Sequence, residues 1–380
     1  MNLPAASCRD LAIEQNDLIV ATYGRALWAI DDLSPLRELA SNKGPTASSN
    51  AYLFAPAPAV RMQWDTYTDT PLNPDVAAAE NPPDGAIIDY YLKSAPPGDL
   101  KLEIYDSAGK LVRAYSSGGA ASLDYKVNVP SFWLAPPPLL PSKSGVNRFV
   151  WDLRYPDPEQ LLYTYYGVHV NYFEYTLADH AIPHNTPWHE PQGPMVVPGQ
   201  YEVRLTVGGE VFRQPITVKL DPRLKVATRE LQQQLDLAQK IGAIMNATYE
   251  SYDEVAHLRT ELATRLASLK QAGSSGALSA VEALDGKAQG LADGTNPAGL
   301  GPMNRDLTRL LIAVDQSDTP PASEIVETFT GMCQEANAAL VRWGELRDKD
   351  LAELSSMLAQ QSSAPLSAYK VSVAGLDCGK

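Results

Sequence analysis

The hydrophobic and polar positions of the chain change their period once along its length. Up to Asp221, apolar side chains recur at every second position in short runs, the pattern of β-strands with one buried face. From Thr228 onward they recur at steps of three and four, the pattern of amphipathic helices. The sequence therefore predicts an α+β multidomain chain in which a β region precedes a helical region.

The β region begins with a hairpin over residues 17–31, which turns at Tyr23-Gly24-Arg25. Gly208-Gly209 can adopt the positive φ that a two-residue hairpin turn needs, so a second hairpin is expected around that pair. Six or more short strands with turns between them predict an antiparallel Ig-like β-sandwich over residues 51–221. Long loops interrupt this region at 118–146 and 156–198. The strand candidates are 51–54, 60–64, 86–92, 100–105, 110–115, 145–155, 199–207 and 210–218.

The helical region contains a pattern without proline over residues 228–272, which would form a helix roughly 65 Å long. A second long stripe follows the cap residue Ser323 and continues to Leu358. Two shorter amphipathic segments, 278–291 and 303–314, lie between them. Short connections favour antiparallel neighbours, so we expect an up-down helical bundle with two long helices over residues 222–362. Residues 363–380 are small and polar and are predicted as a flexible tail.

Composition and charge exclude several classes of function. The chain has 380 residues and a formal net charge of -14, a balance that disfavours binding to nucleic acid or to anionic membrane surfaces. No run of 18 apolar residues exists, so no membrane span is predicted. The sequence contains no P-loop, no G-x-G-x-x-G, no G-x-S-x-G and no H-E-x-x-H. We therefore predict no catalytic residue, no metal and no cofactor.

The three cysteines, Cys8, Cys333 and Cys378, lie far apart and show no C-x-x-C spacing. This spacing argues against a zinc knuckle and against a dense disulfide framework. Cys333 falls on an apolar helical stripe and is interpreted as a small buried hydrophobe. A Cys8–Cys378 bridge stays open, with no feature of the sequence in its favour.

The most suggestive chemistry lies in the second long loop, where histidines and aromatic residues gather. The favoured interpretation is a proline-stiffened loop that covers the β-sandwich with aromatic side chains. A zinc site at His180 and His184 and an aromatic surface for sugar or peptide are the alternatives, although Pro183 disfavours the helix that would align the two histidines. The candidate binding residues are His169, Tyr172, His180, His184, Trp188 and His189.

A second candidate, the adjacent pair Asp31 and Asp32, could supply the two carboxylates that a glycosidase needs. Neighbouring aspartates point in different directions, and they stand between a strand and a possible helical turn. The pair is therefore interpreted as structural.

One segment resembles a known family. Asn16–Leu36, NDLIVATYGRALWAIDDLSPL, is similar to the segment that closes the last blade in bacterial sortilin-like, BNR-repeat β-propeller proteins, which are often labelled glycosyl hydrolase-like. Tyr23 stands where that family usually has His. Residues 81–92, 147–155 and 198–205 also resemble the family's C-terminal region.

The resemblance implies that residues 1–50 are the remnant of a last propeller blade with its linker. It further implies that the propeller precedes this chain and that the full-length protein is periplasmic or extracellular. The S-x-D-x-G-x-x-W box of BNR repeats is absent, and no catalytic residue can be carried over from the family.

The function expected from these observations is a non-catalytic accessory or scaffolding region that mediates contacts with a protein or a glycan. One alternative is part of a glycoside hydrolase whose catalytic propeller lies upstream. The other is an oligomerisation module that self-associates through its long helices.

Overall fold

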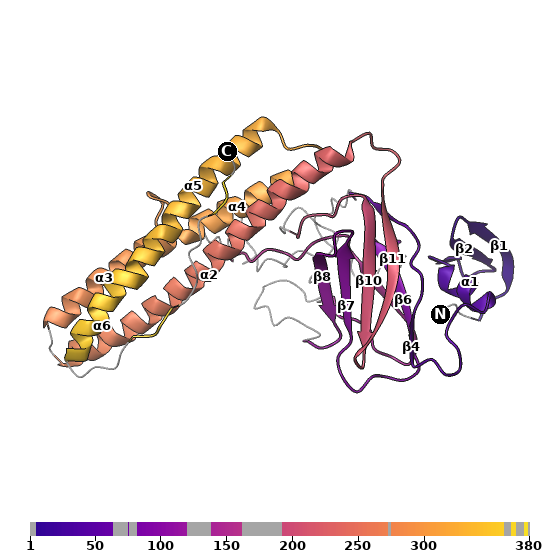
Figure 1. Ribbon diagram of the computed structural model, residues 1–380, viewed down its shortest axis with the longest axis horizontal. Coiled ribbons are helices and arrows are strands. Elements are labelled where there is room, and N and C mark those ends of the chain that lie inside the picture. Colours follow the sequence, from indigo (N-terminus) through magenta and orange to yellow (C-terminus); the bar gives the residue numbers. More distant parts are fainter. Residues whose placement is uncertain are drawn as a thin grey trace. The chain divides into compact units, whose positions relative to one another are not determined.

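A computed structural model describes residues 5–63, 75, 82–119, 138–161, 192–272, 275–360, 366–369 and 376–378. The chain divides into two compact units, each described here by itself. The β unit comprises residues 1–126, 135–156 and 195–228, and the helical unit comprises residues 127–134, 157–194 and 229–380. The predicted mixture of β elements followed by long helices is confirmed, as the change from indigo and magenta strands to orange and yellow helices shows (Figure 1).

The β unit begins with an antiparallel sheet of order β1-β2-β3, formed by β1 (Cys8–Glu14), β2 (Asp17–Thr22) and β3 (Leu27–Ile30). The predicted hairpin corresponds to β2 and β3, and β1 is an additional strand that the sequence pattern did not indicate. A short helix, α1 (Ser34–Ala40), follows the sheet.

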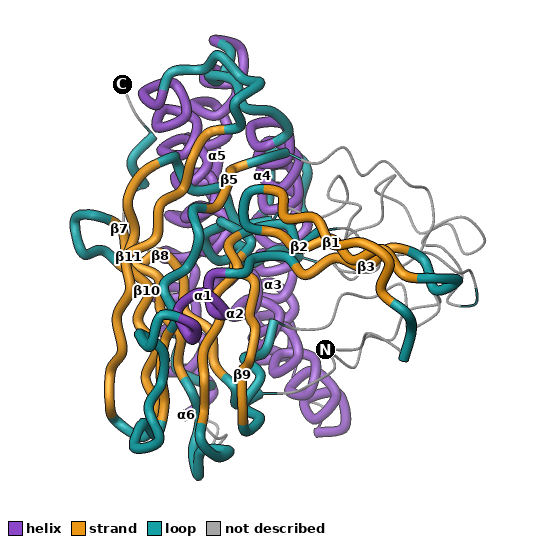
Figure 2. Tube along the Cα trace, turned by 90° about the vertical axis from the view of Figure 1, so that its right-hand side faces the viewer, coloured by secondary structure: helices purple, strands orange, loops and turns teal. Residues whose placement is uncertain are grey.

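Two further sheets form the larger part of the β unit (Figure 2), and their strands agree with the predicted ranges within a few residues. β5 runs parallel to β11, and the other pairings are antiparallel. One sheet has the order β5 (Ala59–Arg61), β11 (Glu210–Leu220), β10 (Gly199–Val207), β7 (Lys101–Asp106) and β8 (Leu111–Ser116). The other has the order β4 (Ala51–Leu53), β6 (Ala86–Leu92) and β9 (Gly145–Trp151).

These two sheets share one hydrophobic core, because alternate residues of their strands point to the same side. On β10, Tyr201, Val203 and Leu205 are buried while the residues between them are more exposed. Trp151 of β9 is fully buried, and its ring meets that of Tyr201 edge-on at a centroid distance of 5.6 Å. This aromatic pair joins the two sheets across the core.

The helical unit is built from one long helix and a series of shorter ones. The predicted helix over 228–272 is confirmed, and the second long stripe proves to be α5 and α6 joined by a five-residue π-helical segment, η3. The elements are α2 (Thr228–Ala272), α3 (Ser275–Asp293), α4 (Leu300–Asp315), α5 (Ser323–Glu345), η3 (Leu346–Asp350) and α6 (Leu351–Gln360).

Two apolar clusters of the helical unit contain successive parts of α2, one up to Met245 and one from Val255. A buried polar side chain, that of Asn304, lies against α2 between these two parts. Asn304 of α4, fully buried, donates to the carbonyl of Met245 at 2.9 Å, and its Oδ1 accepts the amide of Leu161 at 2.8 Å. The hydrogen bond to Asn304 therefore attaches Leu161 to α4.

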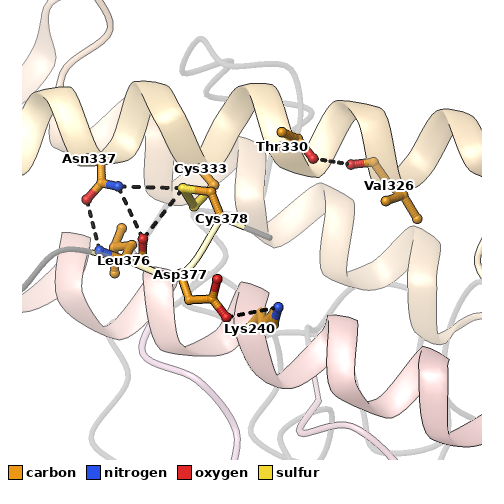
Figure 3. The surroundings of a disulfide bond; sticks show 8 residues. All are labelled: Lys240, Val326, Thr330, Cys333, Asn337, Leu376, Asp377 and Cys378. Atoms are coloured by element: carbon orange, nitrogen blue, oxygen red, sulfur yellow. Dashed lines mark hydrogen bonds and ion pairs between the residues drawn. A yellow bond between two sulfur atoms is a disulfide. The ribbon is translucent and has the colours of Figure 1, made fainter. Parts of the chain in front are cut away.

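The C-terminal segments pack on the helices where they are described. Leu366 is buried, and Tyr369 donates to Glu261 at 3.3 Å. Cys378 forms a disulfide with Cys333 of α5, with the two Cα atoms 5.5 Å apart (Figure 3). Parts of the stretch predicted as a flexible tail are thus attached to the helical unit.

The disulfide corrects the interpretation of the cysteines. Cys333 is fully buried, as its helical position indicated, but it is covalently bonded and is not simply a small hydrophobe. A Cys8–Cys378 bridge is excluded, because Cys378 pairs with Cys333 and Cys8 is free and exposed. The physical reason for the error is that a chain folding back over 45 residues leaves no periodic trace in the sequence.

Asp221, just after β11, provides a test of how acid affects the β unit. Its carboxylate accepts hydrogen bonds from the side chain and the backbone amide of Arg223, and these lower its pKa from 3.8 to about 2. A pKa that is lower in the folded state means that the ionised carboxylate stabilises the fold above about pH 4 and loses this effect as the pH falls towards 2. We expect Asp221→Asn to flatten the pH dependence of the unfolding free energy between pH 4 and 2, measured by urea titration. An unchanged slope would contradict this role.

Candidate binding groove

The outer face of the five-stranded sheet carries an open groove of about 550 Å³. Its position follows from strand alternation: Gln200, Glu202 and Arg204 of β10 point away from the core because Tyr201, Val203 and Leu205 point into it. The register places Glu202 opposite Tyr105 of β7 on one side and Pro215 of β11 on the other. Polar side chains from three neighbouring strands and their turns therefore meet in one place. The groove is lined by Tyr105, Asp106, Ser107, Gly109, Gln200, Tyr201, Glu202, Arg204, Arg213, Gln214 and Pro215.

Two arginines of the groove approach the carboxylate of Glu202. Arg204 donates to its carboxylate, and the Nε atom of Arg213 lies 3.9 Å away. The hydrogen bond with Glu202 is the main cause that raises the pKa of Arg204. The Arg204 guanidinium also lies over the ring of Tyr105, 3.8 Å from its centroid. With two guanidinium groups around one carboxylate, this part of the groove has an excess of hydrogen-bond donors.

The second carboxylate of the groove belongs to a turn. Asp106 accepts hydrogen bonds from the backbone amides of Ala108 and Lys110, each at 2.9 Å, and so stabilises the connection between β7 and β8.

The hydroxyl of Tyr201 donates to the carbonyl of Val197 at 2.7 Å, and burial raises the pKa of this hydroxyl. Arginine, glutamate, glutamine and tyrosine side chains together can donate to and accept from a polar ligand such as a sugar or a peptide.

The candidate binding residues of the second long loop, His169, Tyr172, His180, His184, Trp188 and His189, lie outside the described residues. The pair Asp31 and Asp32 is described. Asp32 accepts the amide of Ser34, the first residue of α1, at 2.9 Å and also receives the side-chain amide of Asn16. The backbone carbonyl of Asp31 accepts Arg148 at 2.7 Å. This arrangement agrees with the structural interpretation of the pair.

The groove residues were missed by sequence reasoning, although a signal for them exists. The alternation Gln200, Glu202, Arg204 marks the outward face of a strand whose other face is apolar. What the sequence does not show is which strands stand beside β10, and hence that Tyr105 and Arg213 join the same face.

Within the described residues, no helix is both long enough and apolar enough to cross a membrane. Comparison with protein-family models finds no match for the chain, and no curated protein and no solved structure matches it either. The similarity of Asn16–Leu36 to sortilin-like propeller proteins therefore stays a prediction.

Proposed function

We propose that the chain is a non-catalytic accessory region that binds a glycan through the groove of the five-stranded sheet. The observation that carries this proposal is the cluster of Tyr105, Glu202 and Arg204 on an open sheet face. Planar amide, carboxylate and guanidinium groups suit the paired hydroxyls of a sugar, and tyrosine adds an amphipathic ring. Both groove carboxylates already have partners within the fold, which suits recognition better than proton transfer.

The finer architecture belongs to the same proposal. We take the two sheets that share a core to be an Ig-like β-sandwich, and α2 to α6 to be an up-down helical bundle. Antiparallel pairing and a common core support the β-sandwich. Contacts between α4 and α5 and between α3 and α6 support the helical bundle. The similarity of Asn16–Leu36 to the end of a propeller supports treating the β1-β2-β3 sheet as part of a blade.

An exported location is part of the proposal, and the Cys333–Cys378 disulfide supports it. Disulfides form and persist in oxidising environments such as the periplasm and the cell exterior and are rare in the cytosol. The resemblance to an exported family points the same way.

The glycan proposal is tested by probing a glycan array with the full chain and titrating each bound sugar against groove variants. We expect Arg204→Ala and Glu202→Ala to weaken binding at least about tenfold, because each removes charged hydrogen-bonding groups from the groove. Lys101→Ala, an exposed change on β7 outside the groove lining, is the matched control and should bind as the unchanged chain does. Absence of any bound glycan, or groove variants that bind normally, would overturn the proposal.

Self-association through the helices is a second candidate, and one observation favours it. Val326 and Val341 of α5 and Met357 of α6 expose 44%, 53% and 41% of their surfaces, so a second copy could cover apolar surface there. Sedimentation velocity of the full chain at several concentrations distinguishes this candidate from a monomeric glycan-binding chain.

A further inference from the structure

The helical unit contains a pocket of its own, unconnected with the groove of the proposed function. Its volume is about 440 Å³, within the range of roughly 300–1,000 Å³ typical of small-molecule sites. One wall is α3, where Gly286 and Gly290 stand four residues apart on one face. A Cβ atom added to either glycine would meet no atom within 4 Å, so the missing side chains leave open space.

The opposite wall is the end of α5 with the π-helical segment η3. Leu346 and Asp350 of η3 both line the pocket. A π-helical turn interrupts the regular spacing of an α-helix and is found frequently at functional sites. Leu346 and, from α3, Leu291 give the pocket an aliphatic part.

The charged side chains of the pocket comprise one ion pair and two residues outside it, Arg342 and Glu345. Lys287 and Asp350 form an ion pair at 3.0 Å and neutralise each other. Arg342 donates from Nη2 to the carbonyl of Ala298, but its Nε–H is buried without a hydrogen-bond partner. Within the described part of the chain, neither Arg342 nor Glu345 takes part in an ion pair.

Arg342 and Glu345 lie three residues apart, so both side chains are on the same face of α5. A simple anion bound to Arg342 would be repelled by Glu345, and a simple cation bound to Glu345 would be repelled by Arg342. A ligand that carries both charges satisfies both groups.

We propose that this pocket binds the zwitterion of an amino acid with an aliphatic side chain. The carboxylate of the ligand accepts from the guanidinium group of Arg342, and the ammonium group donates to Glu345. The aliphatic side chain lies between Leu291 and Leu346, over the open surface at Gly286 and Gly290. The proposal does not depend on the glycan-binding function, since it concerns other residues in the other unit.

The experiment is isothermal titration of the full chain with three probes of matched shape: L-leucine, 4-methylpentanoate and isopentylamine. L-leucine carries both charges, and each of the others carries one. We expect L-leucine to bind at least about tenfold more tightly than either analogue. Equal binding of 4-methylpentanoate would overturn the zwitterion assignment, and absence of heat with all three probes at millimolar concentration would overturn the site.

Three variants localise the binding. Gly290→Leu fills the pocket and should abolish leucine binding, whereas Gly331→Leu, at an exposed α5 glycine whose Cβ is equally unobstructed, is the matched control and should leave it unchanged. Glu345→Gln changes an exposed side chain, so the fold should tolerate it. It should weaken L-leucine at least about tenfold and remove the penalty on 4-methylpentanoate. Leucine binding unaffected by both Gly290→Leu and Glu345→Gln would show that the ligand binds elsewhere.

Discussion

Replacing Cys378 by serine is expected to lower the unfolding free energy of the helical unit by about 3–4 kcal/mol. The disulfide joins Cys333, in the middle of α5, to the end of the chain across a sequence separation of 45 residues. Closing a loop of that length removes unfolded-state entropy equivalent to about 4 kcal/mol at 25 °C in the chain-entropy model. We place the expected effect at or just below this figure, because the unfolded chain retains some residual structure.

The disulfide also holds a set of weaker contacts in place (Figure 3). Asn337 accepts the amide of Leu376 at 3.1 Å and donates to its carbonyl at 3.4 Å. Asp377 forms an ion pair with Lys240 of α2 at 3.1 Å. Residues 376–378 thus contact both α5 and α2. Once the covalent bond is lost, these few contacts are not expected to offset the entropy of ordering the segment.

Urea unfolding followed by far-UV circular dichroism measures the effect of Cys378→Ser. Reductant provides an internal check, since it should shift the unchanged chain to the curve of the variant and leave the variant where it is. Cys8→Ser is the control, because Cys8 is exposed and free and its loss should change the unfolding free energy by less than about 0.5 kcal/mol. Coincident curves for Cys378→Ser and the unchanged chain would refute a stabilising disulfide.

The disulfide is a feature that the local sequence patterns of this chain do not predict. Period-two alternation located strands such as β7, where Leu102 and Ile104 are fully buried, because burial of one sheet face directly determines the pattern. The three-four period located α2 for the same reason. Both patterns are local. The pairing of Cys333 with Cys378 depends on where a distant segment returns, and the sequence carries no local signal for it.

Two other features were missed for related physical reasons. Every residue of β1 is exposed, so this strand has no buried face to create an alternation. The π-helical segment η3 continues the helical stripe of α5, and a single displaced turn changes the period too little to be seen in the sequence. Both candidate sites depend on features of this kind: the groove on the order of the strands, and the amino-acid pocket on the pairing of α3 with the end of α5.

Replacing Arg148 by methionine is expected to destabilise the β unit by about 3–5 kcal/mol. Asp89 of β6 is 3% exposed, and its two carboxylate oxygens accept Nε and Nη2 of Arg148 on β9 at 2.9 and 2.8 Å. The two residues stand directly opposite each other in the register. Burial alone would lower the pKa of Arg148, but the hydrogen bond and charge of Asp89, together with the charges of Asp32 and Asp31, outweigh it, and the pKa is raised. Methionine would leave the buried carboxylate of Asp89 without its partner.

A double-mutant cycle separates the cost of an unpaired charge from the value of the pair. The variant Asp89→Leu/Arg148→Met removes both charges, so we expect it to recover most of the stability lost in Arg148→Met. Arg213→Met is the control: this arginine is 59% exposed beside Glu202, and its loss should cost less than about 1 kcal/mol. Failure of the double variant to recover would mean that the other contacts of Arg148, its packing and its hydrogen bonds to the carbonyls of Asp31 and Asp32, determine the loss.

Arg148 also contacts the segment after β3, so the effect of its replacement should differ from one part of the β unit to another. Its Nη1 donates to the carbonyl of Asp31 at 2.7 Å, in the segment that leads from β3 into α1. The guanidinium therefore joins the β4-β6-β9 sheet to the exit of the first sheet. Arg148→Met should raise hydrogen exchange in residues 27–40 more than in β7 and β10, because the side chain donates to Asp31, Asp32 and Asp89, which belong to neither strand. A uniform increase across the β unit would instead indicate global destabilisation without loss of this link.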